Sequence, residues 1–194
     1  AQQPLGMALH GLGDIDGART YFEQAVRLAE RGGQPRPLAA AINALAQFHR
    51  AAGDDAQARP LYDRVLVLAR QLGDPVAIAI AQLNLAMVAV GAGESQAARA
   101  GLLDVLNVIA AGGADPVAQS VIEVCAGLAA SAGDVPPAAR LFGFAEAHNE
   151  RTGLQRDAAD ARFLLPLIER ARAAAPAAFA EQARAGGELA LEAA

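Results

Sequence analysis

The chain contains no lysine and no tryptophan, and it has one cysteine among 194 residues. Without lysine it cannot form the glycine-rich phosphate-binding loop, which requires a lysine followed by serine or threonine. The single cysteine, Cys125, excludes an internal disulfide. Because Cys125 lies in an apolar stretch, we expect it to be a small buried hydrophobic side chain.

Histidine is also scarce, and the three copies lie far apart at His10, His49 and His148. None is spaced from another histidine or from Cys125 as metal ligands are. No serine, cysteine or histidine constellation for nucleophilic catalysis can be assembled either. We therefore expect no catalytic residue, no metal site and no cofactor, and a chain that is not an enzyme.

Basic runs and long apolar runs are absent as well. All 16 basic residues are arginines, and with 21 acidic residues they give a formal net charge of −5. The arginines are interspersed with acids, so the basic footprint of a nucleic-acid-binding protein is missing. No apolar run reaches the roughly 18 residues of a transmembrane helix, and there is no signal-peptide pattern. We expect a soluble, cytoplasmic protein with no direct nucleic-acid partner and no membrane partner.

The chain is rich in alanine, the strongest helix former, which makes up about a quarter of all residues. It also has a regular glycine pattern. Two glycine series run through the sequence at intervals of forty residues, half a repeat apart. They are Gly13, Gly53, Gly93 and Gly133, and Gly33, Gly73, Gly113 and Gly153. Two turn positions that share one interval predict an array of two-helix units.

Acidic residues directly follow the first glycine series and predict helix starts. They are Asp14, Asp54, Glu94 and Asp134. Carboxylates at these positions accept hydrogen bonds from the first free backbone N–H groups and suit the positive end of the helix dipole. Asp74-Pro75 and Asp115-Pro116 have the pattern of an N-cap followed by proline at the first helical position.

The repeat resembles the tetratricopeptide family in its small and aromatic positions. A small residue recurs in each second helix at Ala18, Ala58, Ala98 and Ala138, and an aromatic follows four residues later at Phe22, Tyr62 and Phe142, with Leu102 departing from the pattern. Small residues allow two helices to approach closely, and the aromatic fills the space to the next unit. A repeat of forty residues, longer than the family's 34, implies helices that are longer by about one turn.

This resemblance implies an all-α fold, a right-handed superhelix of antiparallel helix hairpins. We expect about four and a half repeats and a C-terminal capping helix. The expected units of this single domain cover residues 1–33, 34–73, 74–113 and 114–153, followed by a terminal helix and cap over residues 154–194. Because the chain starts with Ala1 inside an apparent helix, we expect it to be a fragment of a larger multidomain protein. Pro166 should kink the helix expected over residues 157–174.

A second resemblance covers the last third of the chain. The segment AARLFGFAEA at residues 138–147, followed by ERTG at residues 150–153, is similar to the segment that closes helical-repeat regions in bacterial signal-transduction ATPases. These include LuxR-type transcriptional regulators and cyclase-linked ATPases. The resemblance implies an ATPase before this region and an effector after it, which in the regulators is a DNA-reading domain.

The tetratricopeptide resemblance also implies a partner-binding concave wall, lined by the first helix of each unit. The wall positions that we expect to bind a partner are Met7, Asn43, Gln47, Arg50, Leu83, Met87, Glu123, Phe163 and Arg170. Its middle is apolar and its flanks are polar, as in a peptide-binding groove. Leu83 and Met87 can equally be buried side chains, covered by the C-terminal helix or by a second copy of the chain.

The function expected from these patterns is protein–protein interaction or sensing within a bacterial signal-transduction or transcriptional regulator. The partner would be a protein, a peptide or other domains of the same polypeptide. Two alternatives stay open. One is a small-molecule inducer-binding sensor with a pocket near Arg50 and Arg170, and the other is a scaffold that forms a homodimer.

Overall fold

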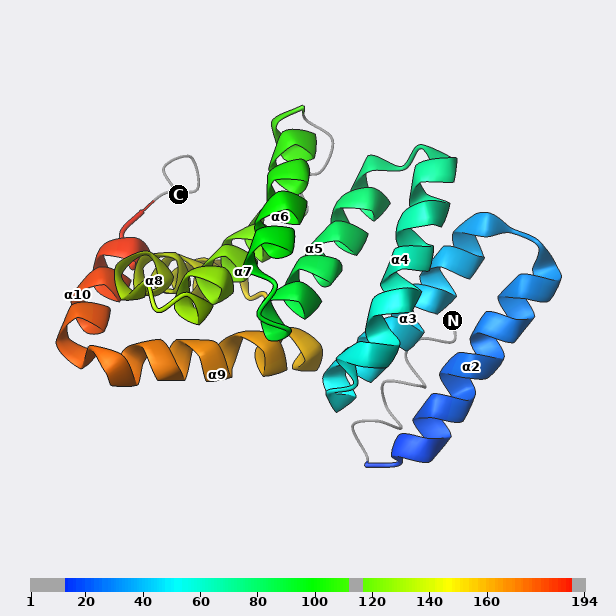
Figure 1. Cartoon of the computed structure of the whole chain (residues 1–194), viewed down its shortest axis with the longest axis horizontal. Coiled ribbons are helices and arrows are strands. Elements are labelled where there is room, and N and C mark those ends of the chain that lie inside the picture. The colour runs from blue at the N-terminus through cyan, green and yellow to red at the C-terminus, as the bar shows by residue number, and fades with distance from the viewer. Residues whose placement is uncertain (1–12, 112–116, 190–194) are drawn as a thin grey trace. The chain divides into compact units, whose positions relative to one another are not determined.

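The computed structural model describes residues 13–111 and 117–189, and these ranges contain nine α-helices and no strand (Figure 1). The expected all-α class is confirmed. The helices are α2 (Ile15–Gly32), α3 (Pro35–Ala52), α4 (Asp55–Leu72), α5 (Pro75–Gly91), α6 (Ser95–Ala110), α7 (Ala118–Ser131), α8 (Val135–Thr152), α9 (Ala158–Ala174) and α10 (Pro176–Gly187).

The glycine series ends helices, as the sequence predicts. The residues after α2, α3, α4 and α8 are Gly33, Gly53, Gly73 and Gly153, all left-handed with φ of 63°, 83°, 60° and 71°. Only glycine adopts this conformation without a steric penalty, so these positions fix where the helices stop. Gly113 lies outside the described residues.

The expected acidic caps form in part. Asp14 accepts a hydrogen bond from the Gly17 amide at 2.9 Å, and Asp54 accepts one from the Gln57 amide at 3.2 Å. The side chains of Glu94 and Asp134 make no capping bond. For Asp134 the cause lies in the sequence. Capping bonds come from the second and third helical amides. In α8 these positions are Pro136 and Pro137, which have no N–H.

The described helices belong to two compact units, one ending at Ala81 and the other beginning at Gln82, so the division falls inside α5. In the first unit α2, α3 and α4 pack around one apolar cluster. Its buried members are Ala18, Phe22, Val26, Ile42, Ala44, Leu45, Phe48, Val65 and Ala81. The rings of Phe22 and Phe48 lie 5.6 Å apart and join α2 to α3. Ion pairs between Arg64 and Glu30 and between Arg36 and Asp74 link neighbouring repeats at the surface.

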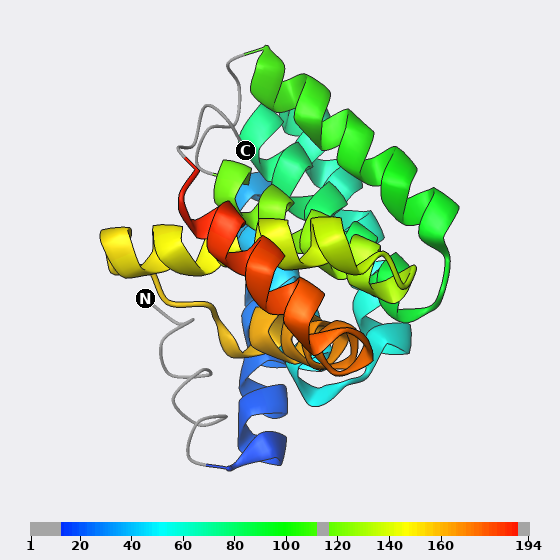
Figure 2. The same cartoon turned by 90° about the vertical axis from the view of Figure 1, so that its left-hand side faces the viewer.

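In the second unit the α7–α8 hairpin is covered by two helices. α9 packs on α7, and α10 crosses α8 at very close range (Figure 2). A Cβ atom on Gly143 of α8 would clash with the carbonyl oxygen of Ala183, and one on Gly186 of α10 with that of Arg140. Glycines on both helices therefore allow backbone-to-backbone contact. The buried cluster here is Ala126, Ala139, Phe142, Leu164, Ile168, Ala171 and Phe179.

The repeated small residues have the environment expected of them. Ala18, Ala58, Ala98 and Ala138 are all completely buried. The aromatic positions Phe22, Tyr62 and Phe142 are buried too, and Leu102 occupies the same position in α6. α9 continues through Pro166 as one helix from Ala158 to Ala174.

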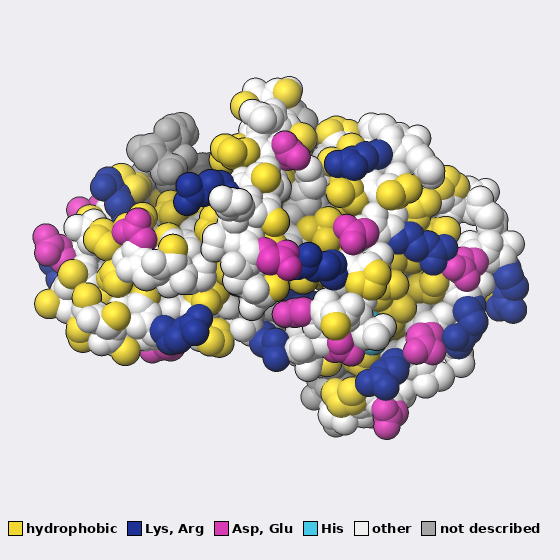
Figure 3. All heavy atoms as spheres, in the orientation of Figure 1, with side chains coloured by type: hydrophobic (Ala, Val, Ile, Leu, Met, Phe, Trp, Pro, Cys, Tyr) yellow, Lys and Arg dark blue, Asp and Glu magenta, His cyan; other side chains and the backbone are white. Residues whose placement is uncertain are grey.

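The described surface carries both signs of charge, and arginines and acids alternate over the face of each unit shown in Figure 3. None of the described helices combines the length and the apolar character that crossing a bilayer would require.

Candidate functional site

Three of the predicted wall residues share one face of α3. Asn43, Gln47 and Arg50 are spaced by four and three residues, which places them on one side of a helix. We call these three residues the α3 stripe. The opposite side of α3 carries Leu45, which belongs to the buried cluster of the first unit. Packing of that apolar side fixes the rotation of α3 and hence the direction of the stripe.

Asn43 provides the unusual feature of the stripe. Its side chain is half-buried, and its Oδ1 atom is inaccessible to solvent and has no hydrogen-bond partner in the part of the chain that the structure describes. Leaving a buried acceptor unpaired costs about 1–3 kcal/mol. Gln47, one turn later, is also half-buried. The two amides together offer donors and acceptors that are matched by a peptide backbone.

Arg50 is the last residue of the α3 stripe and lies in the last turn of α3. It is only 3% exposed, and its Nε donates a 3.2 Å hydrogen bond to the hydroxyl of Tyr62 on α4. Tyr62 is fully buried at the aromatic position of the repeat. The arginine is therefore held within the α3–α4 hairpin, and its positive charge suits the C-terminal end of α3.

His49 precedes Arg50 in the sequence, but its side chain interacts with the turn that follows α3. Its Nδ1 lies 3.7 Å from the Asp54 carboxylate, and its ring meets Phe48 edge-on. Burial lowers the pKa of His49, an effect that the nearby Asp54 carboxylate opposes. His49 is therefore predominantly neutral at pH 7 and packs as part of the hairpin.

The apolar wall residues of the second unit are buried. Leu83 is 3% exposed and Met87 is 6% exposed on α5. The sequence left burial of these two side chains open, under the C-terminal helix or under a second copy of the chain, and the structure shows them buried within a single chain.

Glu123, another predicted wall residue, lies in a buried ion-pair network. Its Oε1 accepts hydrogen bonds from Arg156 Nη2 at 2.7 Å and from Arg156 Nε at 3.2 Å. Arg156 also reaches Glu146 at 2.8 Å, and Asn149 donates to Glu123 at 3.3 Å. Burial alone would lower the pKa of Arg156, but the hydrogen bonds and charges of both glutamates outweigh it and raise that pKa. The network joins α7, α8 and the loop before α9.

Phe163 and Arg170 lie on α9 in different environments. The Phe163 ring covers Gly127 of α7 so closely that a Cβ there would clash with it, so it contributes to helix packing. Arg170 is exposed. Arg50 lies in the first unit and Arg170 in the second. Met7, the remaining predicted wall residue, is outside the described residues.

Sequence reasoning missed two partners, Tyr62 for Arg50 and Arg156 for Glu123. Tyr62 was recognised only as an aromatic packing residue, and a tyrosine among phenylalanines was the available signal for a buried hydroxyl that needs a partner. Arg156 carries no local signal, because its partners are 10 and 33 residues away in the sequence.

The described residues contain no group of three or more histidine, cysteine or acidic side chains that could hold a metal ion. Cys125 is largely buried, and burial raises the pKa of its thiol. A raised pKa makes a thiol less reactive, as expected of a packing residue.

Comparisons with known proteins found matching family models and similar solved structures. Two family models described as tetratricopeptide repeat match residues 5–32 and 37–109. Among solved structures, the chain is similar to the nearly identical TPR-like repeats of a candidate kinesin light chain from Podosopora anserina. The TM-score is 0.63 at 21% identity, over 95% of this chain and 92% of that one. A single-substitution variant of the same protein gives a TM-score of 0.64 with the same identity and coverage. None of the curated proteins matches the chain. At this identity the structures show the shared fold alone.

Proposed function

This chain carries tetratricopeptide repeats, and on that premise we propose that it is an interaction module whose α3 stripe holds a peptide segment of a partner. Tetratricopeptide repeats generally mediate protein–protein interaction and are typically non-catalytic scaffolds. The partner is another protein, a peptide or another domain of the same polypeptide.

The observation that carries this proposal is the unpaired Oδ1 atom of Asn43. We expect the Asn43 side chain to turn outward when an extended peptide binds, so that a peptide backbone N–H pairs with this otherwise buried acceptor and binding recovers the free energy that the free chain loses there. Gln47 offers a second amide one turn away on the same face. Two amides on one face bind a peptide backbone independently of its side chains, and neighbouring contacts then provide specificity.

The test is a binding measurement on the full 194-residue chain. A displayed peptide library selects a ligand, and its affinity is then compared between the parent chain and the variants Asn43→Ala and Gln47→Ala. Each amide hydrogen bond contributes about 0.5–1.5 kcal/mol, so each variant should bind roughly 2–10-fold more weakly. Gln71→Ala on the exposed end of α4 is the matched control and should bind like the parent chain.

Stability distinguishes a binding role from a structural one. Asn43→Ala removes an unpaired buried acceptor, so the free chain should melt at the same temperature or higher while its peptide affinity falls. A lower melting temperature with unchanged affinity would show that Asn43 supports the fold. Unchanged affinity in both stripe variants would place peptide binding elsewhere.

We further propose that the module works in the cytoplasm within a bacterial signal-transduction regulator. The support is the similarity of residues 138–153 to the closing segment of helical-repeat regions in such regulators. Docking of a partner then shifts the balance between resting and active states through different affinity for the two. The reading frame of the gene tests this, since we expect a phosphate-binding loop upstream and a helix-turn-helix downstream. A frame that has neither contradicts the regulator proposal and leaves the peptide-binding proposal standing.

A further inference from the structure

One exposed face of α6 carries an apolar residue between two opposite charges. We call it the outer face of α6, and it consists of the exposed residues Gln96, Arg99, Ala100, Leu103, Asp104 and Asn107. The opposite side of the helix carries Ala98 and Val105, which are completely buried. α6 therefore packs on its neighbours from that side and presents the outer face to solvent.

The repeat itself shows that leucine is unusual on this face. Leu103 is 56% exposed, and its equivalents one and two repeats earlier are the acids Asp63 of α4 and Glu23 of α2. Leu106, one turn further along α6, is 44% exposed, and Figure 3 shows hydrophobic side chains at the surface over this helix. The fold does not require leucine at position 103, so its exposure indicates a contact made outside the single chain.

The outer face of α6 has the spacing of a parallel two-stranded coiled coil. If Ala100 is position a of the heptad, Leu103 takes position d and Asn107 takes the next position a. Leucine at d is typical of parallel dimers, and a single asparagine at a specifies their register and number of strands. A second copy of the same helix is the occupant that this pattern fits.

The charges of the outer face are complementary to themselves in the same arrangement. Arg99 takes position g and Asp104 takes position e. In a parallel pair, position g of one helix faces position e of the other, five residues later. Arg99 of each copy would therefore lie opposite Asp104 of the other copy, which gives two ion pairs related by the twofold axis. Within the described residues Arg99 makes no ion pair that would compete with this contact.

A buried amide holds Asp104 in position. Gln82 on α5 is only 7% exposed, and its Nε2 donates a 3.0 Å hydrogen bond to Asp104 Oδ2. The carboxylate is thus anchored by one oxygen at the edge of the outer face, and its other oxygen can accept from a guanidinium group. Because α6 is already folded, pairing does not carry the entropic cost of forming the helix.

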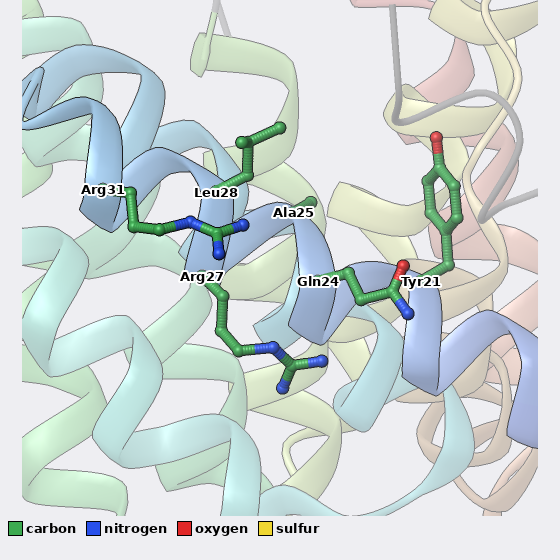
Figure 4. Close-up of a pocket in the computed structure, with 6 residues that line it drawn as sticks. All are labelled: Tyr21, Gln24, Ala25, Arg27, Leu28 and Arg31. Atoms are coloured by element: carbon green, nitrogen blue, oxygen red, sulfur yellow. The ribbon is translucent and has the colours of Figure 1, made fainter.

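The exposed face of α2 lacks this self-complementarity. A hollow of about 220 Å³ on it is lined by Tyr21, Gln24, Ala25, Arg27, Leu28 and Arg31 (Figure 4). The charged residues of this lining are both arginines, so two copies of the face would bring like charges together, which repel. Among these two faces, only that of α6 matches a second copy of itself.

We propose that the outer face of α6 pairs with the same face of a second copy of this chain, in a parallel contact about a twofold axis. α6 has 16 residues, which is fewer than the three to four heptads of a sustained coiled coil. The dimer is therefore weak, with a dissociation constant on the order of 10–100 µM. This surface is distinct from the α3 stripe, so either proposal can fail while the other stands.

The test is sedimentation equilibrium of the full 194-residue chain at low salt, at concentrations from about 5 to 500 µM. The mean mass should rise from that of a monomer towards that of a dimer. Leu103→Glu should weaken dimerisation about tenfold or more, because a leucine contact is replaced by two carboxylates that repel each other. Val67→Glu, the same kind of change at a 53% exposed position of α4, is the matched control and should dimerise like the parent chain.

A charge exchange tests the parallel register. Arg99→Asp opposes two carboxylates and Asp104→Arg opposes two guanidinium groups, so each variant alone should dimerise about fivefold more weakly or worse. When the two variants are mixed, both ion pairs form again with their charges exchanged, and dimerisation should recover towards that of the parent chain. A misfolded variant cannot produce this recovery.

Three outcomes would overturn the proposal. A monomeric mass at every concentration would leave α6 to a different partner. A dimer that Leu103→Glu weakens no more than Val67→Glu does would form through another surface. Absence of recovery in the mixture of Arg99→Asp and Asp104→Arg would exclude the parallel pairing.

Discussion

At the scale of single residues, the helix contacts of this chain depend on where a Cβ atom can be tolerated. Ala18 and its three repeat equivalents are completely buried, as the resemblance of these positions to the small residue of the tetratricopeptide repeat implied. Gly143 and Gly186 have no such periodic signal. Their absence of a side chain matters only because α10 crosses α8, a contact between segments about forty residues apart.

Two helix-interior glycines should respond oppositely to alanine. In Gly143→Ala the added Cβ meets the Ala183 backbone, which cannot move without displacing α10, so we expect a loss of about 1–3 kcal/mol in unfolding free energy. In Gly101→Ala the nearest atom, the Gln82 carbonyl oxygen, is 3.7 Å away. That variant should gain about 0.5–1 kcal/mol from the better helix propensity of alanine. Urea unfolding followed by circular dichroism measures both, and a neutral Gly143→Ala would contradict the close α8–α10 contact.

At the scale of helices and turns, prediction succeeded where the determinant is local. Gly33, Gly53 and Gly73 end their helices because the left-handed conformation is a property of the residue itself. The prediction that Asp134 caps α8 is wrong for an equally local reason, because Pro136 and Pro137 have no N–H to donate. The ion pairs of Arg156 depend instead on which helices meet, and a single sequence does not contain that information.

The charged side chains of the Arg156 network should depend on one another for their contribution to stability. Arg156→Met leaves Glu123 buried without its counter-charge, so we expect a loss of roughly 3–5 kcal/mol in unfolding free energy. Replacing Glu123 by methionine as well removes the uncompensated charge and should recover most of that loss. Arg27→Met, at an exposed ion pair, is the control and should cost less than about 1 kcal/mol. Equal losses in the single and the double variant would show that packing, and not charge, dominates at Arg156.

At the scale of the whole molecule, the sequence predicted the order and type of the helices but not the division into two compact units. The repeat register runs without interruption across Ala81 and Gln82, and both lie inside the continuous helix α5. The division into two units depends on contacts among many residues, whereas the forty-residue repeat shows only which positions are equivalent. The α3 stripe shows the same limit, because its location was predictable from the family pattern and its unpaired acceptor was not.

A destabilising substitution in one unit should therefore lower the stability of mainly that unit. Phe48→Ala removes a ring that is 2% exposed in the first unit, and Ile168→Ala removes a side chain that is 1% exposed in the second. Each truncation should cost about 2–5 kcal/mol, and in a repeat array such a loss acts chiefly on neighbouring elements. Amide hydrogen exchange should show faster exchange in α2–α4 for Phe48→Ala and in α7–α10 for Ile168→Ala, with the other unit retaining its protection. If either truncation accelerated exchange equally throughout, the chain would unfold as one cooperative body, and the contact division at Gln82 would have no energetic counterpart.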